Sequence, residues 1–349
     1  MIWYLLLFII VFLKICFGKM KSYKKKRAFL LISGILIILV MGCRYADVSL
    51  RGDLNNYYRM FQSTFDVAWQ DIFTTFSYME PGYVLLNKVL TVFFPWQQSI
   101  IFIEALICVY FVSRFILKFD VDPFVGILVY LAQGIWIFQL TGFRQAIAIS
   151  LCMFSLEFVQ QQKFGKFAVI TLIAMTFHYT AIVFAVFYFA SKIKIKKTSI
   201  FIYILITAIL FISSDRLLQL GSEMTGTDYN TAATWGNLLG PTINIMFYIL
   251  ILYLLYVYKE KEDKKILLYW NMTLIGLIVY CMRFISLPFE RISFYFLWGS
   301  IAALPYGITL IHNARVRSML KYGVILALIV LYVYRITSTV GLEYRFFWK

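Results

Sequence analysis

The chain has 349 residues, of which 62% are apolar and only 14% charged. This composition excludes a soluble domain and is typical of a helical protein that crosses a membrane several times. The net charge of +16 does not indicate a nucleic-acid partner, because the positive residues lie in short loops where they set topology and attract anionic lipid. Without a linker, repeat or low-complexity segment, we expect one membrane domain over residues 1–349.

Apolar segments follow one another along nearly the whole chain, and each is a candidate for a transmembrane or half-spanning helix. The first one precedes a basic cluster, which is the reverse of a signal peptide, so we expect a retained span whose N-terminus lies outside. The predicted fold class is all-α, a polytopic membrane protein with about twelve such helices, at residues 1–17, 28–43, 98–117, 124–140, 143–160, 167–177, 179–191, 198–213, 241–258, 266–285, 292–311 and 319–335.

The run 167–190 holds His178, one of only two histidines, and has lysines on both sides. Basic loops of membrane proteins stay cytoplasmic, so this run must enter and return rather than cross once. Each leg is then about 17–20 Å long, shorter than a hydrocarbon core of ~30 Å. We therefore predict a broken, re-entrant helix pair at 167–191 with His178 at the turn, where an ionisable residue marks a candidate functional site.

This hairpin places every basic loop in the cytoplasm and leaves two long segments outside, at 44–97 and 214–240. It also requires that residues 83–94 do not cross the membrane, so we expect a helix at the membrane surface there. The cytoplasmic loops carry no Walker motif and no glycine-rich phosphate loop. We therefore expect a long extracytoplasmic loop at 44–97 and any chemistry on the outer face.

Three residues are candidates for catalysis. Arg144 lies in the first turn of a helix, where backbone N–H groups favour an anion and a guanidinium adds phosphate recognition; the alternative is an arginine that reaches lipid phosphates. His178 could act as base, acid or phosphate contact, or be a buried histidine bonded to a neighbouring helix. Asp53 could orient or deprotonate an acceptor hydroxyl, or only stabilise a turn.

Arginines near a second outer turn are candidates for binding a substrate anion. Arg283 and Arg291 bracket this turn and suit a pyrophosphate. The alternative is structural, because Glu290 offers Arg291 an ion pair.

Further binding candidates lie in the segment 44–97. Arg44 opens it, and Tyr57 is one of several aromatic residues that could stack on sugars. Glu80 precedes Pro81, which is a common first residue of a helix, so a capping role competes with substrate binding for Glu80.

We expect no metal and no cofactor. Asp120 and Asp122 form a DxD pattern of the kind that binds metal in some soluble glycosyltransferases, but it lies in a very short turn before Pro123 and is interpreted as chance. Two histidines, no carboxylate cluster and cysteines without metal spacing offer no other site. Glu104 lies inside an apolar segment, where it needs a partner or water.

The order of these motifs resembles a known family. Between Arg44 and Phe296 the chain reads R…GDLNNYY, EPGYVLLNK, FRQAIAIS, FHYTAIVF and ERISFYF. This order and spacing resemble the EpsG family of bacterial exopolysaccharide proteins, which are Wzy-like polymerases. One departure is that Gly52 directly precedes Asp53, where the family usually has a residue between them.

The resemblance implies a glycosyltransferase in the bacterial plasma membrane that joins undecaprenyl-pyrophosphate-linked oligosaccharide units on the outer face, with inversion and without a metal or nucleotide sugar. Arg144 would hold the donor pyrophosphate, with Arg291 or Arg283 as a second contact, and Asp53 or His178 would take the acceptor proton.

The partners implied by the resemblance are the lipid-linked oligosaccharide, membrane lipid, a flippase and a chain-length regulator, with no nucleic acid. Two alternatives stay open. One is a lipid-linked oligosaccharide flippase or transporter, since broken helices also fit transporters. The other is a glycan ligase of similar architecture, which would differ in its acceptor.

Overall fold

The computed structural model describes residues 1–45, 54–225, 238–258, 263–339 and 342–348. In these ranges the chain is helical apart from turns, short extended links and one isolated β-bridge between Arg44 and Phe346. The elements are α1 (Ile2–Phe17), α2 (Tyr23–Gly42), α3 (Leu54–Asp66), α4 (Ile72–Thr75), α5 (Pro81–Phe93), α6 (Ser99–Lys118), α7 (Pro123–Ala132), α8 (Ile135–Gln139), α9 (Phe143–Gln160), α10 (Phe164–Met175), η1 (Tyr179–Val186), α11 (Phe187–Ala190), α12 (Lys197–Ile212), α13 (Ser214–Thr225), α14 (Leu239–Val257), α15 (Lys264–Cys281), η3 (Met282–Phe284), α16 (Pro288–Leu297), α17 (Ser300–Thr309) and α18 (Ala314–Ser338).

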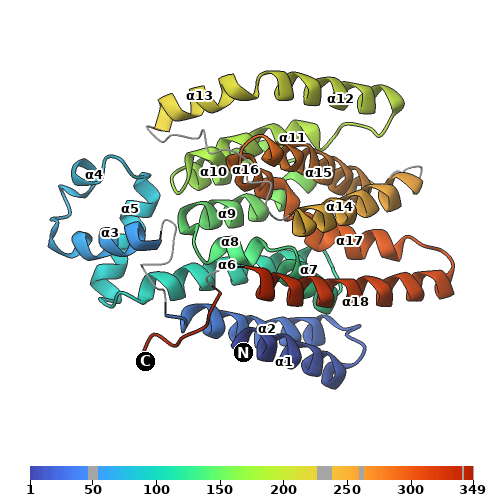
Figure 1. Ribbon diagram of the computed structural model, residues 1–349, viewed down its shortest axis with the longest axis horizontal. Coiled ribbons are helices and arrows are strands. Elements are labelled where there is room, and N and C mark those ends of the chain that lie inside the picture. The colour runs from blue at the N-terminus through green and yellow to red at the C-terminus, as the bar shows by residue number, and fades with distance from the viewer. Residues whose placement is uncertain (46–53, 226–237, 259–262, 340–341, 349) are drawn as a thin grey trace.

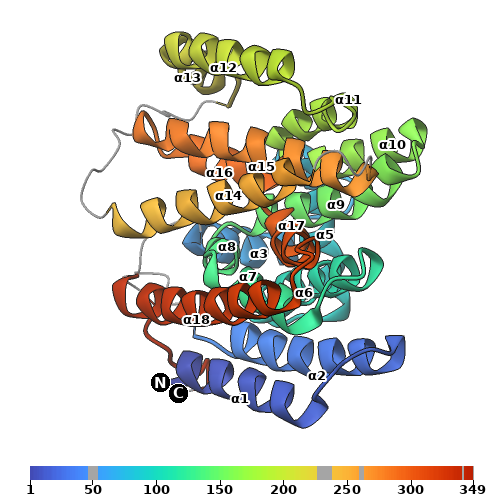
Figure 2. The ribbon, with the colours of Figure 1, turned by 90° about the vertical axis from the view of Figure 1, so that its right-hand side faces the viewer.

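The long helices lie in a stack that runs from α1 and α2 at one edge to α12 and α13 at the other (Figures 1 and 2). Helices α3, α4 and α5 cover one end of this stack (Figure 1). The two chain ends lie together, because the Trp3 indole donates to the Leu342 carbonyl at 2.8 Å and the Tyr332 hydroxyl donates to the Trp3 carbonyl at 3.0 Å. One continuous apolar core therefore joins the N-terminal and C-terminal helices.

Four helical stretches in the described part of the chain are long and apolar enough to cross a membrane: α6, α14, α15 with η3, and α18. Two bent pairs raise the number to six if each forms one span, α12 with the start of α13 (63°) and α16 with α17 (48°). All twelve predicted segments contain helix, but several are too short or too broken to cross alone. The all-helical class is confirmed, and the count of twelve spans stays a prediction.

The predicted helix at 124–140 is broken in the structure. Gly134 has φ 81° and separates α7 from α8. The Arg335 Nε donates to the Ala132 carbonyl at 2.6 Å, so the arginine satisfies a carbonyl that the broken helix leaves open. A Cβ at residue 134 would lie 2.7 Å from the Arg335 guanidinium. The break therefore needs a glycine, for its backbone conformation and for the space that the arginine fills.

We expect Gly134→Ala to destabilise the protein by about 1–2 kcal/mol, because a side chain in the left-handed region costs that much and the methyl group would displace Arg335. Thermal unfolding of the purified protein in detergent measures the loss. Gly165→Ala is the control, since a Cβ there meets open space and alanine favours a helix. Equal losses in the two variants would contradict the explanation.

The segment 44–97, predicted as a long extracytoplasmic loop, contains α3, α4 and α5 where the structure describes it. Its position outside the membrane stays a prediction. Helix α3 is amphipathic, and its apolar side chains recur at the spacing of one helix face. They form a small core with α5 and with the first turns of α6 and α9, which contains Leu54, Tyr57, Tyr58, Phe61, Tyr83, Val84, Ile100, Ile101 and Phe143. A surface helix at 83–94 was expected, and α5 occupies that place.

Lys88 ties α5 to α3. Its side chain is buried, and Nζ donates to the carbonyls of Thr64 at 3.1 Å and Val67 at 2.6 Å. These carbonyls lie at the end of α3, where a helix has no internal donors left and carries partial negative charge. The buried cation therefore fixes the angle between α3 and α5.

The predicted chain reversal at His178 is confirmed. Helix α10 ends at Met175, and η1 begins at Tyr179 and packs back against it. Phe164 and Phe167 at the start of α10 lie 5.0 and 5.3 Å from the ring of Tyr188 near the end of the second leg. The second leg is mainly a 3₁₀ helix, and the depth of the hairpin in a membrane stays a prediction.

Candidate functional site

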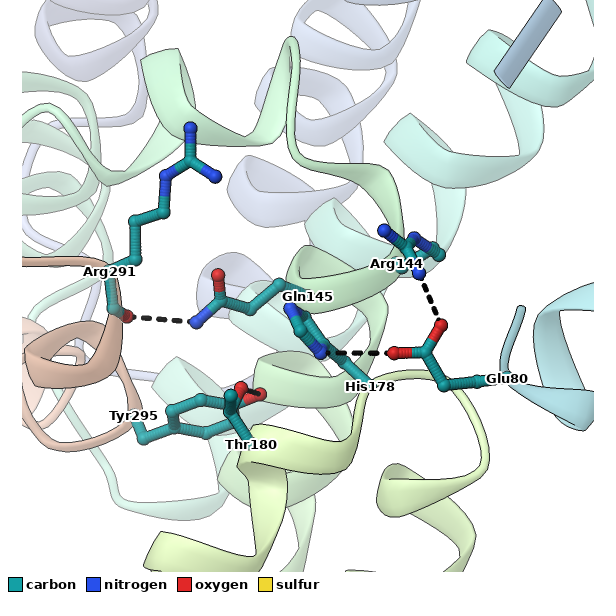
Figure 3. Close-up of polar contacts among 7 residues, drawn as sticks. All are labelled: Glu80, Arg144, Gln145, His178, Thr180, Arg291 and Tyr295. Carbon is teal, nitrogen blue, oxygen red and sulfur yellow. Dashed lines mark hydrogen bonds and ion pairs between the residues drawn. The ribbon is translucent and has the colours of Figure 1, made fainter. Parts of the chain in front are cut away.

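Three element ends meet at one place: the start of α5, the start of α9 and the break between α10 and η1 (Figure 3). The contact between α5 and the break is a backbone one, since the Gly82 N–H donates to the Thr176 carbonyl at 2.7 Å. A Cβ at residue 82 would lie 2.8 Å from that carbonyl oxygen and closer still to the Thr176 hydroxyl. Only glycine allows this approach, which brings residues 80 and 178 together.

Glu80 lies between the two residues that the sequence singles out. Its Oε2 is 2.5 Å from the Arg144 guanidinium, and its Oε1 is 3.2 Å from His178 Nδ1 (Figure 3). The histidine contact has the distance of an ion pair but not the alignment of a hydrogen bond. The Glu80 side chain is 4% exposed, whereas those of Arg144 and His178 are each 23% exposed. The carboxylate is thus an inner partner, and the arginine and histidine face outward from it.

Glu80 stays ionised despite its burial. Burial raises the pKa of this carboxyl, but the contact with His178 and the charge of Arg144 outweigh burial, so the pKa lies below its usual value. Glu80 is also the residue before α5, in the N-cap position, yet its side chain makes no cap hydrogen bond. The capping interpretation therefore holds for its backbone position and not for its carboxylate.

Aromatic rings support the Arg144 guanidinium from the side of α3. Its Cζ lies 5.8 Å from the centre of the Tyr57 ring, a distance at which a cation is attracted to the ring face. Tyr57 in turn stacks on Phe143 at 5.1 Å and 13°. Arg144 Nε is buried and has no hydrogen-bond partner in the described part of the chain. The Nε atoms of Arg44, Arg114 and Arg283 are buried without a partner in the same way, so this N–H is not by itself a sign of a ligand.

Tyr57 packs inside the site, and its role in sugar stacking stays a prediction. Its side chain is buried, and so are those of Tyr58 and Phe61, the other two aromatic candidates for sugar stacking. Asp53, the other candidate base, lies outside the described residues.

Four more polar residues surround the cluster. The Gln145 amide donates to the Arg291 carbonyl at 3.0 Å, and the hydroxyls of Thr180 and Tyr295 lie 3.0 Å apart. Figure 3 shows Arg291 and Arg144 on opposite sides of Gln145. The sequence reasoning missed Gln145, Thr180 and Tyr295, although each lies in a motif it quoted; the available signal was a polar residue within an apolar stretch.

Arg283 lies in an ion pair at the second outer turn. Its guanidinium is 3.2 Å from the Glu290 carboxylate, so Glu290 pairs with Arg283 and the expected pair with Arg291 is not the one formed. Arg291 is more exposed, and its guanidinium lies 5.9 Å from the Phe138 ring. Of these two arginines, Arg291 is the one that the structure brings next to Gln145.

Arg44 and Glu104 have structural partners. Arg44 donates to the Leu140 carbonyl, and its own carbonyl accepts from Gln98 at 2.8 Å. The Cys108 thiol donates to Glu104 at 3.2 Å. None of these contacts involves the Glu80 cluster, and the bond to Leu140 joins Arg44, just after α2, to the end of α8.

The DxD pattern is accounted for by ion pairs. Asp120 is 2.6 Å from Lys26, and Asp122 is 2.6 Å from Lys321 and also caps the start of α7. Across the described ranges, no group of three or more His, Cys, Asp or Glu side chains is arranged to hold a metal ion. Both aspartates therefore act in packing at the end of the stack away from Glu80.

The comparisons with known proteins agree with the order of the motifs. A family model described as the EpsG family matches residues 27–347, a range that includes every side chain drawn in Figure 3. Comparisons with curated proteins and with solved structures give no match. A match over nearly the whole length shows the family, and the chain therefore belongs to the EpsG family.

Proposed function

We propose that this protein is a polysaccharide polymerase that joins oligosaccharide repeat units carried on undecaprenyl pyrophosphate at the outer face of a bacterial plasma membrane. Its family supports a membrane protein of the polysaccharide-polymerase type. The observation on which the proposed reaction rests is the Glu80–Arg144–His178 cluster, in which a buried carboxylate contacts a partly exposed arginine and a partly exposed histidine.

The proposed reaction is a single displacement with inversion. A sugar hydroxyl of the incoming unit attacks the anomeric carbon of the growing chain, the new glycosidic bond forms, and the bond to the pyrophosphate breaks. The pyrophosphate leaves with the bonding electrons, and its growing negative charge needs a fixed cation. Arg144, whose side chain is 23% exposed, supplies this cation, and Arg291 is the second contact. In this proposal the guanidinium groups take the place of a metal.

His178 is the proposed base for the hydroxyl proton. Its Nδ1 faces Glu80, and the other ring nitrogen points away from the carboxylate (Figure 3). A carboxylate beside Nδ1 favours the tautomer with the proton on that nitrogen, which leaves Nε2 able to accept one. Asp53 stays the second candidate for this role.

The test is Arg144→Ala in the native host, followed by analysis of the surface glycan and of lipid-linked intermediates. We expect polymer to fall at least about 100-fold, the effect of removing one preorganised charge-stabilising group, while single repeat units accumulate on the outer leaflet. Lys163→Ala, an exposed lysine at the start of α10, is the control for charge. Protein level in the membrane fraction is measured for both variants.

Other outcomes would overturn the proposal. An unchanged glycan chain length in the Arg144→Ala variant would show that Arg144 has no role in catalysis. Repeat units trapped on the cytoplasmic leaflet would indicate a flippase. Full-length chains that stay on their lipid carrier would indicate a ligase.

A further inference from the structure

A long groove lies between α2 and α6, at a distance from the Glu80 site. Its volume is about 760 Å³. The two helices are antiparallel, because Gln98 donates to the Gly42 carbonyl at one end and Lys26 pairs with Asp120 at the other. Both views show α2 and α6 as neighbours (Figures 1 and 2).

The walls of the groove are apolar along most of its length. Leu31, Ile35 and Leu106 line it with exposed side chains, and Gly34 keeps its floor open. A Cβ at Gly34 would only just touch Val109, at 3.4 Å, so a larger side chain there would extend into the groove. Because α6 is long and apolar enough to span a membrane, this groove would face hydrocarbon chains.

One end of the groove is basic. Arg27, Arg114 and Lys118 line it there, together with Tyr23. Glu157 is the carboxylate that pairs with two of these cations, at 2.7 Å from Arg114 and 3.6 Å from Lys118. Three positive charges thus share one negative charge, and this end carries an excess of positive charge.

We propose that this groove binds an anionic membrane phospholipid, with the phosphate at the basic end and an acyl chain along the apolar walls. The positive charge favours an anionic headgroup, since basic residues at a membrane surface attract anionic lipid. The long apolar walls favour a ligand with a hydrocarbon chain over a free phosphate ion. The proposal does not depend on polymerase activity, because the basic end lies at Lys118, the far end of α6 from the α3–α5 core.

Native mass spectrometry of the purified full chain with dioleoyl phosphatidylglycerol and dioleoyl phosphatidylcholine tests the proposal. We expect the native protein to retain phosphatidylglycerol in preference to phosphatidylcholine. In the variant Arg27→Ala/Lys118→Ala this preference should fall on the order of tenfold. Gly34→Leu should lower retention of the lipid by filling the groove, with the basic end intact. The control Lys163→Ala/Arg315→Ala removes two exposed cations that do not line the groove and should keep the preference.

Equal retention of the two lipids would overturn the proposal, and so would an unchanged preference in the Arg27→Ala/Lys118→Ala variant. Selective retention of undecaprenyl phosphate over phosphatidylglycerol would also overturn it, in favour of the lipid carrier. Loss of polymer in the Arg144→Ala variant has no effect on these measurements, so the two proposals can fail separately.

Discussion

Replacing Glu80 by glutamine is expected to lower polymer formation at least about 100-fold, close to the loss expected for Arg144→Ala. Glutamine keeps the size of the side chain and removes the charge that holds both partners. The Arg144 guanidinium, now 2.5 Å from Glu80, would lose its ion pair in a site that is largely buried, and a charge left there without its partner is strongly destabilising. His178 would lose the carboxylate that favours its Nδ1 proton. Glycan length and lipid-linked intermediates in the host give the readout.

A double variant separates positioning from an independent role. If Glu80 acts through Arg144 and His178, Glu80→Gln combined with Arg144→Ala should lose little more than Arg144→Ala alone. Additive losses would contradict this coupling. Asp122→Asn is the matched control, because it also removes a carboxylate from an ion pair of 2.6 Å, at the other end of the molecule. We expect this control to keep polymer formation.

The Glu80→Gln variant should differ from the native protein in how its stability depends on pH. The pKa of Glu80 in the folded protein lies below the ordinary value of 4.5, so its contribution to stability is fully present above that value and is lost as the pH falls through the folded pKa. The difference in unfolding temperature between the native protein and Glu80→Gln should therefore shrink in acid below pH 4.5. A difference that grows in acid would show that Glu80 is not held as a carboxylate.

The sequence predicted those parts of the fold that depend on local pattern. Apolar runs located the helices, and the lysines on both sides of 167–190 predicted the reversal at His178 through the positive-inside rule alone. The start of α9 placed Arg144 in a first turn. Each of these signals lies within a few residues of the feature it predicts, so tertiary contacts were not needed to find it.

Contacts between distant segments could not be predicted in the same way. Glu80 and Arg144 are 64 residues apart, and the pattern around Glu80 predicted helix capping or substrate binding but no pairing with Arg144. The Arg335 guanidinium that fills the break at Gly134 comes from the far end of the chain. Within 44–97 a helix was expected at 83–94, but α3 was missed because it is strongly amphipathic rather than uniformly apolar, and its apolar face is covered only when α5 packs on it.

Gly82→Ala is also expected to cause a large loss of polymer formation, by changing the geometry of the site rather than its charge. The added methyl group would meet the Thr176 carbonyl oxygen at 2.8 Å, which real side chains avoid, and a backbone oxygen cannot move aside alone. The start of α5 would therefore shift away from the break between α10 and η1. Glu80 and His178 lie two residues from the colliding pair on either side, so the shift would separate them. A displacement near 1 Å in a catalytic arrangement costs on the order of 100-fold in rate.

Polymer length in the host and unfolding temperature in detergent together test this expectation. We expect a loss of stability of about 1–3 kcal/mol, as for other overpacked sites, and a fall in polymer of at least about tenfold. Removing the threonine side chain as well, in Gly82→Ala/Thr176→Ala, should not restore activity, because the collision with the backbone carbonyl remains. Gly240→Ala is the buried control, since a Cβ there makes only an ordinary contact with Tyr334 at 3.5 Å. Full polymer length in the Gly82→Ala variant would mean that the approach of α5 to the hairpin does not set the distance between Glu80 and His178, and the site would then have to tolerate a looser arrangement than the proposed displacement requires.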